Sequence, residues 1–281
     1  MMKTVETEKE LQNFLLKLGK KTFGFVPTMG ALHSGHISLI NAARKECDIV
    51  ICSIFVNPTQ FDKQEDLDKY PITIKEDKKL LEEANCDFLI IPSVNEVYPN
   101  GKDNYTPPNI GNIVNVLEGK HRKGHFNGVM QVVERLLRMT TATHLYMGMK
   151  DYQQFLICSK MTEAVGIEVE MRGMPIIREK DGLAKSSRNV RLTKEGRALA
   201  VNLSKRLKKT KTLLYINNVK RLEKKANNFF EKIEGIDLEY FEIVDKNTLM
   251  KPTGKNKKEN LIALLAAWVD GVRLIDNMVL S

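Results

Sequence analysis

The sequence predicts an α/β protein with a parallel, right-handed, doubly wound sheet, followed by a smaller α+β domain. In the first 175 residues, short apolar runs alternate with amphipathic helical patterns. Several of these runs are apolar almost throughout, as at residues 49–56, which is typical of parallel strands covered on both faces. Beyond residue 175, two helical patterns precede three strand-like runs. We therefore expect two domains, residues 1–175 and residues 176–281.

The first domain opens with a predicted capping box, Thr7 with Glu10, at the start of an amphipathic helix. Strands are expected at residues 22–26, 49–56, 87–91, 144–147 and 168–172. Helices are expected between them at residues 36–46, 73–84, 127–139 and 151–164. Ser34 is the expected N-cap of the first of these helices, and Thr73 with Glu76 forms a second predicted capping box.

The second domain begins with helices and ends with strands. Thr193 is placed to cap a long helix that ends at about residue 213, and a second helix is expected at about residues 218–233. Strands are expected at residues 238–244, 261–269 and 272–280. Asp270 and Gly271 between the last two strands are typical of a two-residue hairpin turn.

The composition is that of an ordinary globular protein, with 42% hydrophobic and 28% charged residues in 281. No apolar run reaches the length that crosses a membrane, and the N-terminus lacks the apolar segment of a signal peptide. The four cysteines form no C-x-x-C pair. We therefore expect reduced, buried thiols and a cytoplasmic protein without a membrane partner.

The net charge of +9 comes almost entirely from the C-terminal third. Residues 1–190 hold 25 Lys and Arg against 24 Asp and Glu, whereas residues 191–281 hold 19 against 11. The excess gathers at residues 205–211 and 220–225, which favours a solvated helix face or attraction of anionic substrates. A nucleic-acid-binding protein would interleave exposed aromatic residues with such cations, and Tyr215 is the only aromatic residue of this stretch, so we expect no nucleic acid partner.

The segment with the clearest chemical meaning is His33-Ser34-Gly35-His36, at the turn from an apolar strand into a helix. Such a turn lies at the edge where open parallel sheets bind ligands, and the positive end of the helix dipole favours phosphate. Gly30 and Gly35 carry no Cβ, so a nucleotide can approach the backbone closely.

The two histidines can donate hydrogen bonds to phosphate oxygens as negative charge builds on them. The segment therefore predicts an H-x-G-H nucleotide-binding loop in an enzyme that cleaves ATP between its α and β phosphates. Two histidines at this spacing could also bind a metal ion, although no Cys, Asp or Glu clusters with them in the sequence.

Four further polar segments follow predicted strand ends or join the two domains: residues 53–61, 118–129, 148–154 and 178–189. The first brings Asn57 and Gln60 to the same edge as His36, where amides suit a substrate rich in hydroxyl and carboxylate oxygens. The second is rich in cations and glycines and suits a flexible anion-binding loop. The third places Lys150 where a phosphate would lie, and the fourth carries hydroxyls and an arginine suited to a triphosphate tail.

These segments in this order resemble the pantothenate synthetase (pantoate–β-alanine ligase) family of the H-x-G-H nucleotidyltransferase superfamily. The matching stretches are PTMGALHSGH, FVNPTQF, GHFNGV, GMKDYQQ and KSSRN. The resemblance implies a Rossmann-like N-terminal domain that carries the active site, a smaller C-terminal lid domain, a homodimer, and dependence on ATP with Mg²⁺. It implies condensation of pantoate with β-alanine through a pantoyl adenylate, with release of AMP and pyrophosphate.

The resemblance also implies a role for each matching residue. His36, His33 and Lys150 would be catalytic. ATP would contact Met29, Gly30, His33, Gly35, His36, Gly148, Lys150, Asp151, Ile177, Lys185, Ser186, Ser187 and Arg188. Pantoate and β-alanine would contact Gln60, Gln154, Asn57, Pro27, Met29 and His125, and no metal ligand is assigned. Met149 and Lys185 depart from the family's usual residues, but both positions are expected to present main chain to the ligand.

Two other kinds of protein remain as alternatives. One is a different H-x-G-H enzyme, either a nucleotidylyltransferase or a synthetase that charges tRNA, although 281 residues leave little room for anticodon recognition. The other is a nucleic-acid-binding protein that uses the basic C-terminal helices.

Overall fold

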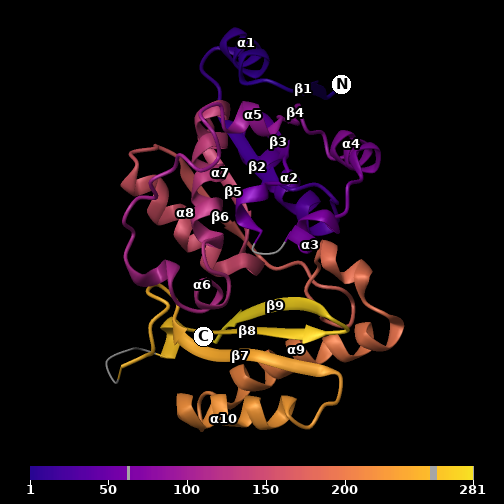
Figure 1. Ribbon diagram of the computed structural model, residues 1–281, viewed down its shortest axis with the longest axis vertical. Coiled ribbons are helices and arrows are strands. Elements are labelled where there is room, and N and C mark those ends of the chain that lie inside the picture. The colour runs from indigo at the N-terminus through magenta and orange to yellow at the C-terminus, as the bar shows by residue number, and fades with distance from the viewer. Residues whose placement is uncertain (62–63, 254–257, 281) are drawn as a thin grey trace. The chain divides into compact units, whose positions relative to one another are not determined.

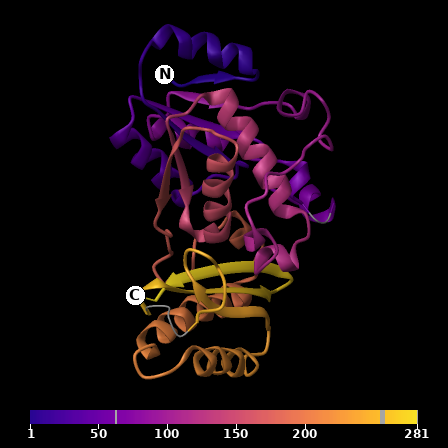
Figure 2. The ribbon, with the colours of Figure 1, turned by 90° about the vertical axis from the view of Figure 1, so that its left-hand side faces the viewer.

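The computed structural model describes residues 1–61, 64–253 and 258–280, and these form two compact units. The first unit comprises Met1–Met149 and Gln153–Pro175. The second comprises Lys150–Tyr152 and Ile176–Ser281. Figure 1 shows the elements of both units, and Figure 2 shows them from the side.

The first unit is built on a six-stranded sheet in the order β1-β4-β3-β2-β5-β6, and every pairing is parallel. The strands are β1 (Lys3–Val5), β2 (Phe23–Thr28), β3 (Ile49–Ile54), β4 (Phe88–Ile90), β5 (His144–Gly148) and β6 (Glu170–Met174). The prediction of a parallel, doubly wound α/β sheet is therefore confirmed. Strand β1 was not predicted, because three residues at an edge carry too short an apolar pattern to detect.

Helices cover both faces of this sheet (Figure 1), with α2 and α4 on one side and α7 and α8 on the other. The helices are α1 (Glu8–Leu18), α2 (Ser34–Glu46), α3 (Gln64–Asp68), α4 (Ile74–Glu83), α5 (Val94–Val97), α6 (Glu118–His121), α7 (His125–Thr140) and α8 (Tyr152–Ala164). Short 3₁₀ helices lie at Pro58–Gln60, Asn112–Val114 and Met149–Asp151. The central strands pack Phe25, Ile51 and Leu145 into the core without exposure.

The helix starts test the capping predictions. The capping box of Thr7 with Glu10 is present. For α2 the predicted N-cap was wrong, because the imidazole of His33, one residue before Ser34, accepts the first-turn amide. The second capping box was also wrong, because Thr73 makes no side-chain cap bond and its hydroxyl instead donates to Asp77 Oδ1 at 3.1 Å.

All four cysteines are buried and form no disulfide bond, as predicted. Burial raises the pKa of the Cys86 and Cys158 thiols to about 12, and it raises the pKa of Cys47 and Cys52 as well. These side chains therefore act as small apolar groups in the core.

The second unit is an antiparallel sheet of three strands with two helices on one face (Figure 2). Its elements are α9 (Lys194–Leu213), α10 (Val219–Phe230), β7 (Ile236–Asp245), β8 (Leu261–Val269) and β9 (Val272–Val279), with a 3₁₀ helix at Ser187–Arg191 and another at Lys258–Asn260. Asp270 and Gly271 both have positive φ, of 50° and 67°, which confirms the predicted hairpin turn. The predicted α+β arrangement of this region is therefore confirmed.

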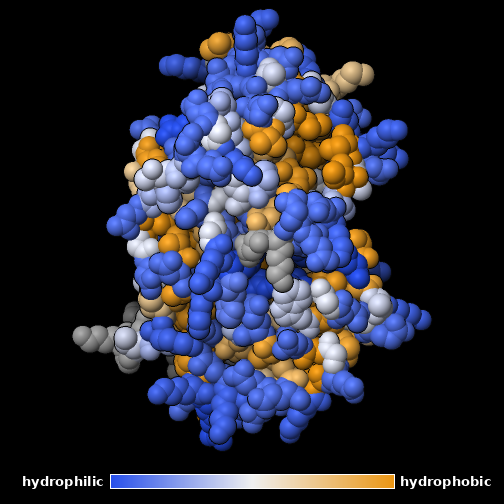
Figure 3. Space-filling view, viewed as in Figure 1, coloured by the Kyte–Doolittle hydropathy of each residue, from blue (hydrophilic) through white to orange (hydrophobic). Residues whose placement is uncertain are grey.

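The basic helices α9 and α10 are amphipathic. Their apolar residues, among them Leu207, Leu222 and Phe230, pack into the core of the second unit. Lys208 and Lys209 are exposed, and Figure 3 shows hydrophilic surface over α10. The excess charge therefore lies mainly on a solvated face. No helix in the described part of the chain is long and apolar enough to span a bilayer.

An ion cluster fixes the C-terminal end of α2 to the sheet. Glu46 accepts from Arg172 Nε on β6 at 2.9 Å and from the hydroxyl of Tyr146 on β5 at 2.6 Å. The Arg172 guanidinium, with a smaller contribution from Tyr146, lowers the pKa of the Glu46 carboxyl to about 2. This cluster joins the last turn of α2 to the two strands at one edge of the sheet.

The lowered pKa predicts how acid affects stability. A carboxyl whose pKa falls on folding stabilises the protein fully above its unfolded pKa of 4.5, and this contribution declines as the pH falls towards 2. We expect Glu46→Gln to flatten the fall in the free energy of unfolding between pH 4.5 and pH 2, as measured by urea denaturation. The exposed Glu76→Gln is the matched control and should keep the wild-type profile. Identical profiles for wild type and Glu46→Gln would contradict this account.

Candidate active site

The histidine loop leaves β2 through a tight left-handed turn. Gly30 and Ala31 have φ of +80° and +49°, which turns the chain from the strand into α2. Thr28 fixes the start of the turn, because its hydroxyl donates to Ser53 O on β3 at 2.7 Å and accepts from Gly30 N at 3.1 Å. Ala31 has no glycine freedom, so its positive φ requires support from its surroundings.

The two histidines of the loop cap the helix together. His33 Nδ1 accepts from Gly35 N at 3.1 Å, and His36 Nδ1 accepts from His33 N at 3.3 Å. Both Nδ1 atoms are acceptors, so each ring carries its proton on Nε2. The rings are stacked with centroids 4.1 Å apart. A Cβ on Gly35 would lie 2.7 Å from His33 Cε1, so only glycine permits this packing.

The main-chain N–H groups of the loop are largely engaged within the protein. The amides of Gly30, Ala31, Leu32, His33 and Gly35 all donate to protein acceptors. The main chain of the turn is therefore held by the protein itself, and the two imidazole rings lie at the N-terminal end of the α2 dipole.

The predicted substrate amide Gln60 lies on the 3₁₀ helix that follows β3. Its Oε1 accepts from Asn57 Nδ2 at 3.2 Å, and its Nε2 lies 3.0 Å from Met29 Sδ in the histidine loop. Asn57 is 1% exposed. Its Nδ2 also donates to Gly128 O at 3.1 Å, and its Oδ1 accepts from Tyr98 OH at 2.7 Å. Asn57 thus fixes the amide orientation of Gln60.

Helix α7 holds the same loop from the other side. His125 Nδ1 lies 2.7 Å from Gln60 O, and its Nε2 lies 3.0 Å from Arg122 NH1. Because a guanidinium only donates, Nε2 accepts and Nδ1–H donates to the Gln60 carbonyl. A Cβ on Gly128 would lie 2.3 Å from Thr59 O, so the helix touches the loop backbone directly.

The strand β5 brings a second polar segment to the same edge of the sheet. It pairs in parallel with β2, so the loops that follow the two strands leave from one edge. Gly148 ends β5, and Gln154, half-buried, lies near the start of α8. Pro27 lies in β2 itself.

The remaining predicted ATP residues belong to the second unit. The main chain of Lys150 is fixed by Asn277 on β9, whose Nδ2 donates to Lys150 O at 2.9 Å. Lys150 Nζ lies 3.6 Å from Asp151 Oδ1. Lys185 N donates to Ile177 O at 2.9 Å, and Ser186 Oγ accepts from Arg188 N at 3.3 Å.

A buried ion pair supports the segment that carries residues 185–188. Arg178 donates from both terminal nitrogens to Asp276 on β9, at 2.7 Å and 2.8 Å, and Asp276 is 3% exposed. Arg178 also pairs with Ala184 across a short antiparallel bridge. The turn that carries residues 185–188 is therefore tied to the sheet of its unit.

The structure joins some of the predicted residues directly. Met29, Gln60, Asn57 and His125 form one chain of contacts, and His33 with His36 form another. Gly148 and Gln154 belong to neither of these two chains of contacts, although they follow the adjacent strand β5. Sequence reasoning missed Asp77, Tyr98 and the Arg178–Asp276 pair, because each acts through contacts between residues far apart in the chain.

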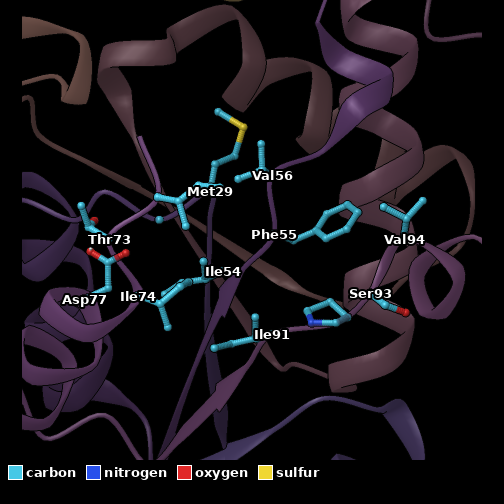
Figure 4. Close-up of a pocket in the computed structure, with 13 residues that line it drawn as sticks. Met29, Ile54, Phe55, Val56, Thr73, Ile74, Asp77, Ile91, Ser93 and Val94 are labelled. Carbon is cyan, nitrogen blue, oxygen red and sulfur yellow. Dashed lines mark hydrogen bonds between the residues drawn. The ribbon is translucent and has the colours of Figure 1, made fainter. Parts of the chain in front are cut away.

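A cavity of about 260 Å³ lies beside the histidine loop (Figure 4). Of the predicted site residues, it is lined only by Met29 and Gly30. Its other walls are mostly apolar, and Figure 3 shows hydrophobic side chains gathered in the region of α4 and β4. The described residues contain no group of three or more His, Cys, Asp or Glu side chains suited to hold a metal ion.

Comparison with known proteins gives a consistent result. A family model described as pantoate–β-alanine ligase matches residues 3–279. The pantothenate synthetase of Porphyromonas gingivalis is 42% identical over 279 residues, with 99% of each chain covered, and that of Thermotoga petrophila is 43% identical over 285 residues, with 100% of each chain covered.

Solved structures agree. The pantothenate synthetase of Thermus thermophilus is similar with a TM-score of 0.92 and 37% identity over 99% of each chain. The pantoate–β-alanine ligase of Francisella tularensis, complexed with β-γ ATP and β-alanine, is similar with a TM-score of 0.82 and 35% identity, over 100% of this chain and 98% of that one.

The contact between α7 and the Gln60 loop predicts a sensitive glycine. Gly128→Ala places a methyl group against Thr59 O, so the helix or the loop must move. We expect the free energy of unfolding to fall by about 1–3 kcal/mol, as measured by urea denaturation. The neighbouring exposed Asn127→Ala is the matched control and should change it by less than about 0.5 kcal/mol. Equal stability of the two variants would show that the loop at Thr59 can move away from the added methyl group without loss of stability.

Proposed function

The chain belongs to the pantoate–β-alanine ligase family, and we propose that it joins pantoate to β-alanine in two steps at the loops described above. The observation that carries this proposal is the stacked histidine pair, with its protons on Nε2, at the start of α2 and at the edge of a doubly wound sheet. Such donors suit the phosphates of ATP. The alternatives of another H-x-G-H enzyme and of a nucleic-acid-binding protein lose support, because the family match spans nearly the whole chain.

In the first step the pantoate carboxylate attacks the α-phosphorus of ATP. A new O–P bond forms, the bond to the β-phosphate oxygen breaks, and pyrophosphate leaves with the bonding electrons. His36 and His33 donate hydrogen bonds to the phosphate oxygens on which negative charge develops, and Lys150 supplies a positive charge. The protein acts mainly by positioning the reactants and neutralising charge.

In the second step the amine of β-alanine attacks the carbonyl carbon of the pantoyl adenylate. The C–N bond forms, the C–O bond to AMP breaks, and the amine loses a proton. A free carboxylate resists attack by an amine, which is why activation comes first. The mixed anhydride hydrolyses readily, so the residues that surround it must exclude water.

The substrate contacts divide into binding and positioning residues. Gln60 and Gln154 bind pantoate, and Gln60 also lies near β-alanine. Pro27 and Met29 line the same substrate-binding site. Asn57 and His125 act through Gln60, because Asn57 is buried and holds its side chain, and His125 holds its carbonyl. These two residues therefore influence the substrate through Gln60.

The proposed ATP contacts follow the matching motifs. At Gly30, Gly35 and Gly148 the nucleotide can approach main chain that carries no Cβ. The other proposed nucleotide-binding residues are Met29, Lys150, Asp151, Ile177, Lys185, Ser186, Ser187 and Arg188. Mg²⁺ enters as the complex with ATP.

The chain acts as a homodimer in the cytoplasm. Domain 1–175 binds nucleotide and pantoate, and domain 176–281 acts as a lid.

The order of the two steps predicts an exchange reaction. Labelled pyrophosphate should enter ATP when pantoate is present and β-alanine is absent, because the first step is reversible without the amine. Gln154→Ala should raise the KM for pantoate in this exchange and leave ATP binding nearly unchanged. A panel of other acids in place of pantoate tests specificity. Exchange without any acid, or only after addition of β-alanine, would overturn the adenylate mechanism.

Loss of the second histidine should slow the first step. His36→Ala removes a donor to the phosphates, and we expect the rate of exchange to fall by about 10²–10⁴-fold in a folded protein. Ser34→Ala is the matched control, since Ser34 is exposed and does not cap α2. Turnover within twofold of wild type in folded His36→Ala would remove this residue from the mechanism.

A further inference from the structure

A buried carboxylate lies directly behind the histidine loop. Asp77, in the first turns of α4, is 1% exposed. Its Oδ2 accepts from Ala31 N at 3.0 Å, and its Oδ1 accepts from Leu32 N at 2.8 Å. Thr73 adds a third donor, with its hydroxyl 3.1 Å from Asp77 Oδ1. Figure 4 shows the side chains of Thr73 and Asp77 side by side at one wall of the cavity.

The carboxylate of Asp77 matches the two consecutive main-chain amides of this turn. A carboxylate has two oxygens that both accept, so it can bind the N–H groups of Ala31 and Leu32 at once. Its charge lies near the start of α4, where the helix dipole stabilises it. No neutral side chain of the same shape offers two acceptors, because the amide of asparagine replaces one of them by a donor.

The turn that Asp77 holds is the one that sets the position of the histidines. Ala31 adopts a left-handed conformation that a non-glycine residue takes at a cost, and its amide is one of the two that Asp77 accepts. Two residues further on, His33 begins the helix cap. The close approach of Asp77 also explains Gly30, where a Cβ would lie 3.1 Å from Asp77 Oδ2.

We propose that Asp77 is a positioning residue for ATP activation: its carboxylate fixes the turn at residues 30–32 and so sets where His33 and His36 meet the phosphates. This inference rests on the proposed function. It assigns Asp77 no contact with substrate. Thr73 assists by holding one carboxylate oxygen in place.

Asp77→Asn tests this with little change in volume. One of the two loop amides would face an NH₂ group, so the turn should shift and displace the histidines. In the pantoate-dependent pyrophosphate exchange, we expect kcat/KM for ATP to fall at least tenfold. When pantoyl adenylate is supplied, its reaction with β-alanine should slow by less than threefold, because that step needs no triphosphate. Glu76→Gln, the exposed neighbour on the same helix, is the matched control and should match wild type in both assays.

The two assays separate the possible outcomes. Exchange by folded Asp77→Asn at the wild-type rate would overturn the inference. An equal loss in both assays, with a reduced fraction of folded protein, would show a merely structural role and would overturn it too.

If Asp77→Asn does not fold, Thr73→Val tests the inference instead, with Thr73→Ser as its conservative partner. A loss of exchange in Thr73→Val that Thr73→Ser restores, with the second step unchanged, supports the inference, and no loss overturns it. Absence of pantoate-dependent exchange in wild type would instead overturn the proposed function.

Discussion

The parallel pairing of β2 with β3 on one side and with β5 on the other is the constraint on which the first unit depends. It places the ends of three central strands at one edge, where the histidine loop, the Gln60 loop and the segment after Gly148 all begin. Short turns after these strands are then enough to bring the predicted site residues into contact. Met29 and Gln60, from loops after neighbouring strands, are in contact for this reason.

Around that edge, hydrogen bonds within the protein hold the predicted site residues in place. The capping bonds fix the proton of each imidazole on Nε2, Asn57 fixes the orientation of Gln60, and Asp77 fixes the turn behind the histidines. Each of these supports is buried or half-buried, where a misplaced donor or acceptor is costly. The predicted site residues are therefore held in one arrangement by the protein itself, which is the preorganisation that electrostatic catalysis requires.

Local patterns predicted the elements well, because apolar periodicity and turn chemistry are properties of neighbouring residues. The alternation of strands and helices and the Asp270–Gly271 hairpin are examples. The failures came where a distant residue competed. The Thr73 hydroxyl bonds Asp77 rather than a helix amide, and an imidazole displaced Ser34 as the cap of α2. Asp77 itself lies 46 positions from Ala31, so no local pattern could reveal their bond. The residues expected at the site came from the order of the motifs, whereas the supports around them follow only from the tertiary structure.

The four buried thiols have a practical consequence for anyone who studies motion in this protein. A thiol reacts as its thiolate, and burial holds the pKa of Cys86 and Cys158 near 12 and raises that of Cys47 and Cys52. At neutral pH the folded chain therefore offers almost no reactive sulfur to a maleimide or a spin label. A single cysteine introduced at an exposed position, such as Lys209 on α9, would carry a fluorophore or nitroxide against a silent background, with the native cysteines left in place.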